Sequence, residues 1–188
     1  MRIVILASGT GSLAQAIIDS VASGDLEVEI VGVISDQPDA MVLQRAAKSE
    51  IKTFIVPMKA NRSDWDRDLS TLVESLKPDL VVSAGFMRIL APDFVSHFRV
   101  INSHPALLPN FPGAHAVRDA LSAGATQTGA TIHWVDKGVD TGKVIAQVRV
   151  DISSDDTQES LHERIKIQER GLIVATIRSL IPGLESEN

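Results

Sequence analysis

Apolar strand-like runs alternate with amphipathic helical segments through the first hundred residues, and this alternation restricts the fold more than any other feature. The runs are nearly continuous and rich in β-branched residues, as in strands that are buried on both faces; they cover residues 2–7, 28–34, 52–56 and 80–84. Apolar residues at helical spacing fill the intervals, over about 13–21, 40–49 and 63–76. Strands that alternate with helices predict a parallel sheet with right-handed crossovers, whose ligands gather at the carboxyl ends of the strands.

The second half of the chain departs from this pattern. A strand is expected to end near residue 104, and a short helix over 116–123 follows it. Two strands that could pair antiparallel come next, over 130–134 and 143–150, and a long last helix covers 156–181. The last helix should end there because Pro182 and Gly183 follow. We therefore predict an α/β fold with a Rossmann-like, mostly parallel central sheet, helices on both faces and an antiparallel addition near the C-terminal half.

Length, charge and cysteine content limit the class of protein. A chain of 188 residues predicts one domain, over residues 1–188. The net charge is −6 and no run of Lys or Arg is present, which argues against a nucleic acid or an anionic membrane as partner. Without cysteines the chain can form neither a disulfide nor a thiolate nucleophile, which fits a reducing compartment such as the cytoplasm. No apolar run approaches the ~18 residues that would span a bilayer.

A glycine turn, residues 8–12, follows the first strand and precedes the first helix. This arrangement points free backbone N–H groups at an anion, so the turn predicts contact with a phosphate. The turn also meets a relaxed dinucleotide fingerprint, because Ala14 follows Gly9 and Gly11 at the right spacing and Asp36 lies near the end of the next strand. A nicotinamide-dependent enzyme is therefore an alternative, and a turn kept only for tight packing is another. A P-loop is excluded, since no Gly-Lys-Ser/Thr is present.

Residues 101–113 contain the end of a strand, near residue 104, and a proline-rich segment that follows it. The three prolines of this segment forbid a helix and a central strand there. Asn102 and His104 are two residues apart, so their side chains face the same way in an extended segment. An amide donor beside an imidazole suits acyl-type transfer, in which one group holds an oxyanion and the other moves a proton. The alternative is a surface connection that happens to contain a histidine.

Two acids lie in a glycine-containing loop, residues 136–142. Asp140 could partner His104, and a nearby carboxylate would raise the pKa of that histidine and favour its protonated form. Aspartates in such loops also serve as turn residues, which is the favoured interpretation for Asp136 and an equal alternative for Asp140. The histidines show no metal-ligand spacing, so no metal is expected. His162, among charged residues on the last helix, is expected to face solvent and has no assigned role.

The segment after the fourth strand, residues 85–92, is unusually apolar for a loop. It could be a core-facing connection with Arg88 on the surface, or the wall of an apolar slot for a flat heterocycle. The fourth strand and the strand that carries Asn102 are expected to be neighbours, so their ends would lie side by side. In that case the loop would border the same site as Asn102 and His104.

Taken together, these motifs resemble the folate-dependent formyltransferases, and in particular their phosphoribosylglycinamide branch, which acts in purine biosynthesis. The resemblance covers essentially the whole chain, in order and without a large insertion. The Asn-x-His-Pro block with a downstream aspartate is specific to the superfamily, and the glycine turn and chain length indicate the branch. The segments that carry the resemblance are 8–12, 84–90, 102–109, 129–135 and 140–142.

The resemblance implies two co-substrates, no metal and roles for individual residues. 10-Formyltetrahydrofolate would donate its formyl group directly to the amine of 5-phosphoribosylglycinamide. Asn102, His104 and Asp140 match the catalytic residues of the family. The positions that match the ribonucleotide site are Gly11, Ser12, Leu13, Pro105 and Glu169. The positions that match the folate site are Arg62, Met87, Arg88, Ile89, Leu90, Asn102 and Asp136.

The resemblance also implies an organisation and a setting. Residues 1–100 would form a phosphoribosyl-binding half and residues 101–188 a catalytic and folate-binding half of one cytoplasmic enzyme, in a family whose members are often homodimers. At the glycine turn it favours a phosphoribosyl group over a dinucleotide.

Two positions depart from the family pattern. Leu13 stands where many relatives carry asparagine, so it could contribute only its backbone N–H, and Lys137 stands where an acid is common.

Other functions remain open at this point. A 10-formyltetrahydrofolate hydrolase would share the three catalytic residues, but its relatives carry an extra N-terminal domain and this chain begins at its first strand. A methionyl-tRNA formyltransferase would need a C-terminal tRNA-binding domain and a basic surface, whereas this chain is acidic. A folate-binding protein without turnover is the non-enzymatic alternative.

Overall fold

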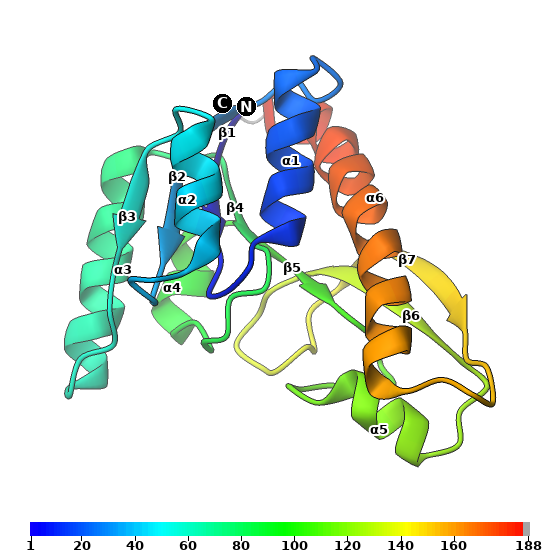
Figure 1. The fold of residues 1–188 in the computed structure, drawn as a ribbon. Helices are drawn as coiled ribbons and strands as arrows, with labels where there is room; N and C mark the ends of the chain where they lie inside the picture. Colours follow the sequence, from blue (N-terminus) through cyan, green and yellow to red (C-terminus); the bar gives the residue numbers. More distant parts are fainter. Residues whose placement is uncertain (186–188) are drawn as a thin grey trace.

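The computed structural model describes residues 1–185 and shows an α/β fold around one seven-stranded sheet (Figure 1). The strand order is β3-β2-β1-β4-β5-β6-β7, with β1 to β5 parallel and β6 and β7 antiparallel to their neighbours, which confirms the predicted fold class. The strands are β1 (Arg2–Leu6), β2 (Glu29–Ser35), β3 (Thr53–Ile55), β4 (Leu80–Ser83), β5 (Val100–His104), β6 (Gln127–Trp134) and β7 (Val144–Asp151). The helices are α1 (Ser12–Ala22), α2 (Met41–Lys48), α3 (Arg62–Leu76), α4 (Pro92–His97), α5 (Ala116–Ser122) and α6 (Gln158–Glu185).

Both faces of the sheet are buried, as continuous apolar strands require. Alternate residues of β1 point to opposite faces: Ile3 and Ile5 pack with α1, α2 and α6, whereas Val4 and Leu6 pack with α3 and α4. A third, smaller cluster joins α5 to β6, β7 and the start of α6. Figure 1 shows α1 and α6 side by side, and these two helices contact each other along the first face.

The strand order reverses beside β1, and this reversal places the candidate site. β2 and β3 lie on one side of β1, whereas β4 and β5 lie on the other. In open α/β sheets, ligands bind at the carboxyl ends of the strands beside such a reversal. Here the two loops that leave β1 and β4 touch, because the Ser8 N–H donates to the Gly85 carbonyl over 3.1 Å. The glycine turn and the 85–92 loop therefore lie together at one edge of the sheet.

Two elements differ from the sequence-based expectation. The six-residue helix α4 has no counterpart among the predicted elements, although Pro92 at its first position is a recognised start signal. The expected end of the last helix before Pro182 is wrong, since α6 continues to Glu185. Burial of Leu184 in the cluster that also contains α1 holds this turn in place and offsets the backbone hydrogen bond that Pro182 cannot donate.

The helix α6 is long enough that its hydropathy must be considered. Although α6 spans 28 residues, neither it nor any other helix within residues 1–185 is apolar enough over a sufficient length to cross a membrane. Its buried positions instead pack against α1 and against β6 and β7. The helix therefore serves as a long cover for one face of the sheet.

Trp65 of α3 packs against the 85–92 loop. Its side chain is fully buried, and its ring stacks on Phe86 with 6.2 Å between the centroids. Its Nε1–H donates to the Val56 carbonyl over 2.8 Å. The indole therefore links the loop after β3, the helix α3 and the loop after β4.

We predict that Trp65→Phe lowers the free energy of unfolding by about 2 kcal/mol, because the change leaves the buried Val56 carbonyl unpaired and opens space around a smaller ring. Chemical denaturation measures the change. Thr71→Ala, on the exposed side of the same helix, is the matched control and should alter the free energy by less than about 0.5 kcal/mol. Equal effects of the two substitutions would contradict the prediction.

Candidate active site

The turn after β1 is built for backbone contact with an anion. Gly11 adopts a φ of 72°, and a Cβ there would lie 2.5 Å from Val42 Cγ2, so a side chain at this position would be strained. The helix α1 begins at the next residue, Ser12, and the first N–H groups of a helix have no partner within it. This geometry supports the expected contact with a phosphate.

A cavity of about 260 Å³ opens beside this turn. Its walls come from the turn 8–13, the segment 84–87, the end of β5 and one side of α6. The five residues predicted for the ribonucleotide site all line it: Gly11, Ser12, Leu13, Pro105 and Glu169. The side chain of Leu13 is buried in the core, which agrees with the packing role expected for it and leaves its backbone to face a ligand.

Glu169 joins α6 to the end of β5 in the wall of this cavity. Glu169 is buried, and its Oε1 accepts a hydrogen bond of 2.7 Å from Ser103 Oγ. Burial raises the pKa of Glu169 above its ordinary value, against the smaller lowering effects of the Ser103 hydrogen bond and of Lys166 and Arg170. Such a carboxyl can exchange hydrogen bonds with a ligand hydroxyl.

Two further side chains of α6 line the cavity, and the sequence-based prediction missed both. His162 is only partly exposed and forms part of the wall with Lys166, so the expectation that His162 faces solvent is wrong. With Glu169 they stand at positions i, i+4 and i+7 of the helix, which share one face. That spacing is the signal from which their common orientation could have been predicted.

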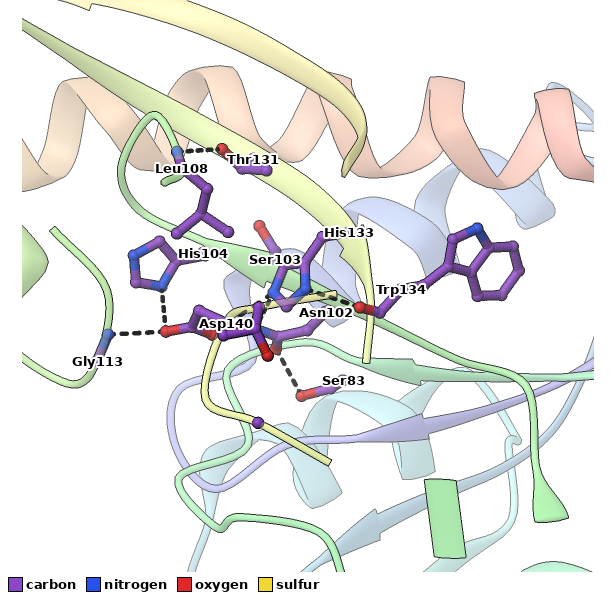
Figure 2. Close-up of polar contacts among 12 residues, drawn as sticks. Ser83, Asn102, Ser103, His104, Leu108, Gly113, Thr131, His133, Trp134 and Asp140 are labelled. Carbon is purple, nitrogen blue, oxygen red and sulfur yellow. Dashed lines mark hydrogen bonds and ion pairs between the residues drawn. The ribbon is translucent and has the colours of Figure 1, made fainter. Parts of the chain in front are cut away.

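Asn102, His104 and Asp140 come together on the other face of β5 (Figure 2). Side chains alternate along this strand, so Ser103 faces α6, while on the other side Asn102 faces His133 of β6 and His104 faces the loop between β6 and β7. Within that loop, Asp140 Oδ2 lies 3.3 Å from His104 Nδ1. The alternative that Asp140 serves only as a turn residue is therefore wrong, because its side chain contacts His104.

Contacts at both ends orient the amide of Asn102. Its Oδ1 accepts a hydrogen bond of 2.8 Å from Ser83 Oγ, and its Nδ2 lies 3.3 Å from His133 Nε2 (Figure 2). The Nδ1 of His133 lies 2.9 Å from the Trp134 carbonyl, which can only accept, so Nδ1 carries a hydrogen, and Nε2 lies near both the Asn102 amide and Asp140 Oδ1. His133 has no role in the sequence-based prediction, yet it contacts one end of the Asn102 amide while the Ser83 hydroxyl binds the Oδ1 end.

The Asp140 carboxylate joins three segments of the chain. Its Oδ2 accepts a hydrogen bond of 2.7 Å from the Gly113 N–H and also faces His104, while its Oδ1 lies 3.5 Å from His133 Nε2. Burial acts to raise the pKa of Asp140, but hydrogen bonds from His133 and Gly113 and the charges of both histidines together lower it below its ordinary value. The carboxylate is therefore ionised at neutral pH.

His104 is buried, and both of its ring nitrogens face acceptors. Nδ1 faces Asp140, and Nε2 lies 2.8 Å from the Phe111 carbonyl. The expectation of a raised pKa is wrong: burial lowers the pKa of His104 and outweighs Asp140 and Phe111, which raise it. A neutral ring has one N–H for two acceptors, so uptake of a second proton would complete both hydrogen bonds.

A second network joins the glycine turn to the 85–92 loop. Asp36 Oδ1 accepts from Ser8 Oγ over 2.6 Å, and Asp36 Oδ2 accepts from Arg88 Nε over 2.7 Å. Ser8 Oγ in turn accepts from the Met87 N–H over 2.8 Å. Both oxygens of this buried carboxylate are thus used within the protein. Asp36 is not placed to bind a ribose, and the dinucleotide alternative loses the acid on which it depended.

Apolar side chains cover the outer surface of the 85–92 loop. Met87 and Ile89 are 68% and 64% exposed, whereas Leu90 is buried. Arg62, at the start of α3, donates through its guanidinium to the Ile89 carbonyl. Arg62 and the predicted wall at 87–90 are therefore in direct contact, although 25 positions separate Arg62 from Met87 in the sequence.

Asp136 stabilises the loop between β6 and β7. Its Oδ1 accepts from the Gly138 N–H over 3.0 Å and from Thr141 Oγ1 over 2.7 Å. These hydrogen bonds, with that of Thr141 the largest effect, lower the pKa of Asp136. The contacts agree with a turn residue, and a contact between Asp136 and folate stays a prediction.

A comparison with known protein families shows the family to which this chain belongs. Residues 1–177 match the family model described as formyl transferase. The match extends from the glycine turn to the α6 residues of the cavity, so it includes every residue assigned above to a candidate site. The chain therefore belongs to the formyl transferase family.

Individual relatives narrow the class further. A phosphoribosylglycinamide formyltransferase of Mycobacterium tuberculosis (strain ATCC 25618 / H37Rv) is 47% identical over 183 residues, which cover 95% of this chain and 84% of that protein. One of Escherichia coli (strain K12) is 40% identical over 187 residues, which cover 97% of this chain and 88% of that protein. The solved glycinamide ribonucleotide transformylase 1 of Symbiobacterium toebii matches with a TM-score of 0.95 at 36% identity and covers 97% of this chain and 88% of its own. The predicted resemblance to phosphoribosylglycinamide formyltransferases is confirmed.

We predict that Asp36→Asn lowers the free energy of unfolding by about 2 kcal/mol at neutral pH, because Arg88 loses its carboxylate partner. Burial acts to raise the pKa of Asp36, but hydrogen bonds from Ser8, Gln37 and Arg88 and the Arg88 charge lower it overall. The stabilisation is therefore complete above the unfolded pKa of about 4 and is lost as the pH falls through the folded value.

Urea denaturation at neutral and at acidic pH checks this. The difference between wild type and Asp36→Asn should shrink as the pH falls. Asp39→Asn, three residues on and exposed, removes the same charge without touching Ser8 or Arg88 and should behave as wild type. A difference that grows on acidification would contradict the assignment of an ionised Asp36.

Proposed function

We propose that this enzyme transfers the formyl group of 10-formyltetrahydrofolate to the amine of 5-phosphoribosylglycinamide. The observation that carries the proposal is the arrangement at the end of β5. Ser103 and Pro105 border the cavity beside the glycine turn, and on the other side of the strand Asn102 contacts His133 and His104 contacts Asp140. Two substrates that approach from these two sides would meet at the strand end.

The ribonucleotide would occupy the cavity. Backbone N–H groups of Gly11, Ser12 and Leu13 would hold the phosphate at the N-terminus of α1. Glu169, in the wall of the same cavity, would bind a ribose hydroxyl. The amine end of the ribonucleotide would then pass Pro105 toward the side chains of the catalytic residues.

Folate would bind on the side of the 85–92 loop. Its pteridine is a flat ring with polar edges, so it needs an apolar surface and backbone hydrogen-bonding groups together. The exposed side chains of the loop offer the first and its main chain the second. The residues proposed for this contact are Arg62, Met87, Arg88, Ile89, Leu90, Asn102 and Asp136.

The amine would attack the formyl carbon directly, and the formyl oxygen would become an oxyanion. Asn102 would donate an amide N–H to that oxyanion, since the Ser83 hydroxyl binds Oδ1 and leaves Nδ2 as the donor end. Removal of one such donor costs about 3–4 kcal/mol of transition-state stabilisation in well-studied acyl transfer. The role requires an amide whose orientation is set before the substrate binds.

His104 would move the proton. The ring starts neutral, takes the proton that the attacking amine loses and delivers it to folate N10 as the bond between N10 and the formyl carbon breaks. Exchange of the Phe111 contact for the substrate would give the ring access to that proton. Asp140 would stabilise the imidazolium between the two transfers, because its ionised carboxylate faces Nδ1.

An assay with three acceptors tests the activity. The purified protein should release tetrahydrofolate from 10-formyltetrahydrofolate when 5-phosphoribosylglycinamide is present. Methionyl-tRNA or water alone should support little release. Release at the same rate without the ribonucleotide would indicate a hydrolase, and binding of the folate without any release would indicate a folate-binding protein. Either result would contradict the proposal.

Asp140→Asn should lower kcat by about 100-fold, because the imidazolium of His104 loses its ionised partner. Asp140 raises the pKa of His104, so its removal should lower that pKa further and move the acidic limb of the kcat/KM profile to lower pH. Steady-state kinetics across the pH range measure both effects. Asp155→Asn, exposed between β7 and α6, is the charge-matched control. Unchanged turnover at every pH would remove Asp140 from the mechanism.

A further inference from the structure

We propose that His162 binds the phosphate of the ribonucleotide and makes the affinity for this substrate depend on pH. The inference rests on the proposed function for the chemical class of the ligand, a phosphate monoester. It goes beyond that function because His162 belongs to neither the catalytic positions nor the ligand positions that the sequence predicts. It also assigns a role to the side chain for which a position facing solvent was expected.

The first support is the place of His162 in the cavity wall. His162 lies one helical turn before Lys166 on α6, and both side chains line the cavity that the glycine turn borders. The same cavity is lined by the residues at the start of α1, Ser12 and Leu13, so the imidazole on α6 and the first N–H groups of α1 border one space. Farther along α6, the two helices pack side by side (Figure 1). A phosphate held by the turn would therefore face His162 and Lys166.

The second support is that nothing in the protein occupies the imidazole. Within residues 1–185, no group forms a hydrogen bond or an ion pair with the His162 ring. His104 and His133, by contrast, each have contacts at both ring nitrogens. The Lys166 ammonium is engaged as well, 2.7 Å from Glu163 Oε1. Of these side chains, His162 alone keeps its polar atoms available to a ligand.

The charged groups that face His162 are few. Burial is the largest effect on the pKa of His162 and lowers it; on the same helix, Lys166 lowers it further and Glu163 raises it. The glycine turn, the segment 84–87 and the end of β5 contribute no charged side chain to the wall. The remaining titratable group of the cavity is Glu169, whose carboxyl is tied to Ser103.

These charges leave a phosphate incompletely neutralised. A phosphate monoester carries a charge of about −1.5 to −2 at neutral pH, whereas Lys166 supplies a single positive charge. A protonated His162 would add a second positive charge and a charge-assisted hydrogen bond. Because the ring is mostly neutral in the free protein, binding and proton uptake are linked. The ligand raises the pKa of His162, and a lower pH strengthens binding.

An NMR titration of the full chain tests the contact without any turnover. The protein has five histidines, and the ring signals of His162 are assigned by their loss in His162→Gln. Saturating ribose 5-phosphate should raise the pKa of His162 by about one unit, a tenfold change in proton affinity. A ring whose titration is the same with and without ribose 5-phosphate overturns the proposal, and this holds even if the variant proves unstable.

Kinetics give the second readout. KM for 5-phosphoribosylglycinamide in His162→Gln should exceed that of wild type about fivefold near pH 6 and less than twofold near pH 8, with kcat unchanged. The titration of the substrate phosphate itself affects both proteins equally, so only the difference between them counts. His97→Gln, at the exposed end of α4, is the matched control and should follow wild type.

The two proposals fail in different ways. If formyl transfer is normal but ribose 5-phosphate leaves the His162 titration unchanged, or the variant KM follows wild type at both pH values, His162 has no role in phosphate binding. If the ring responds to ribose 5-phosphate but no formyl group is transferred to the ribonucleotide, the phosphate contact holds and the proposed activity is wrong.

Discussion

The Asp140 carboxylate is the contact on which the candidate active site depends. Its two oxygens meet groups from β5, from β6 and from the proline-rich segment, namely His104, His133 and the Gly113 N–H. The loop that carries it is constrained for this purpose: Asp140 adopts a φ of 55°, and a Cβ at Gly142 would lie 1.7 Å from the Trp134 carbonyl. The carboxylate contacts both His104 and His133, and His133 in turn contacts the Asn102 amide.

The end of β5 gives this cluster its relation to a substrate. Because side chains alternate, one strand end serves two faces: Ser103 contacts Glu169 of α6 on one face, and on the other Asn102 contacts His133 and His104 contacts Asp140. The reversal of strand order beside β1 brings the glycine turn and the 85–92 loop to the same edge, and the Asp36 network holds them together. Two ligands of different chemistry can thus bind close to one reaction centre.

Features that depend on local periodicity could be predicted from the sequence. Burial on both faces demands continuous apolar strands, so the sheet was predictable, and a period of two places Asn102 and His104 on one side. The protonation of His104 was not predictable, because it depends on burial by segments distant in the sequence. The continuation of α6 past Pro182 depends on where Leu184 packs. The orientation of His162 was accessible from helical spacing, but its charged neighbours indicated solvent.

A crystal structure with 5-phosphoribosylglycinamide and tetrahydrofolate bound together is the most direct test of the central claim, that two ligands from opposite faces of β5 meet at one reaction centre. The expected result is a phosphate on the backbone of the turn 8–13, a pteridine against the 85–92 loop, and the substrate amine about 3–4 Å from folate N10 beside Asn102 and His104. A complex with the phosphate away from the glycine turn, or with N10 remote from Asn102, would contradict it.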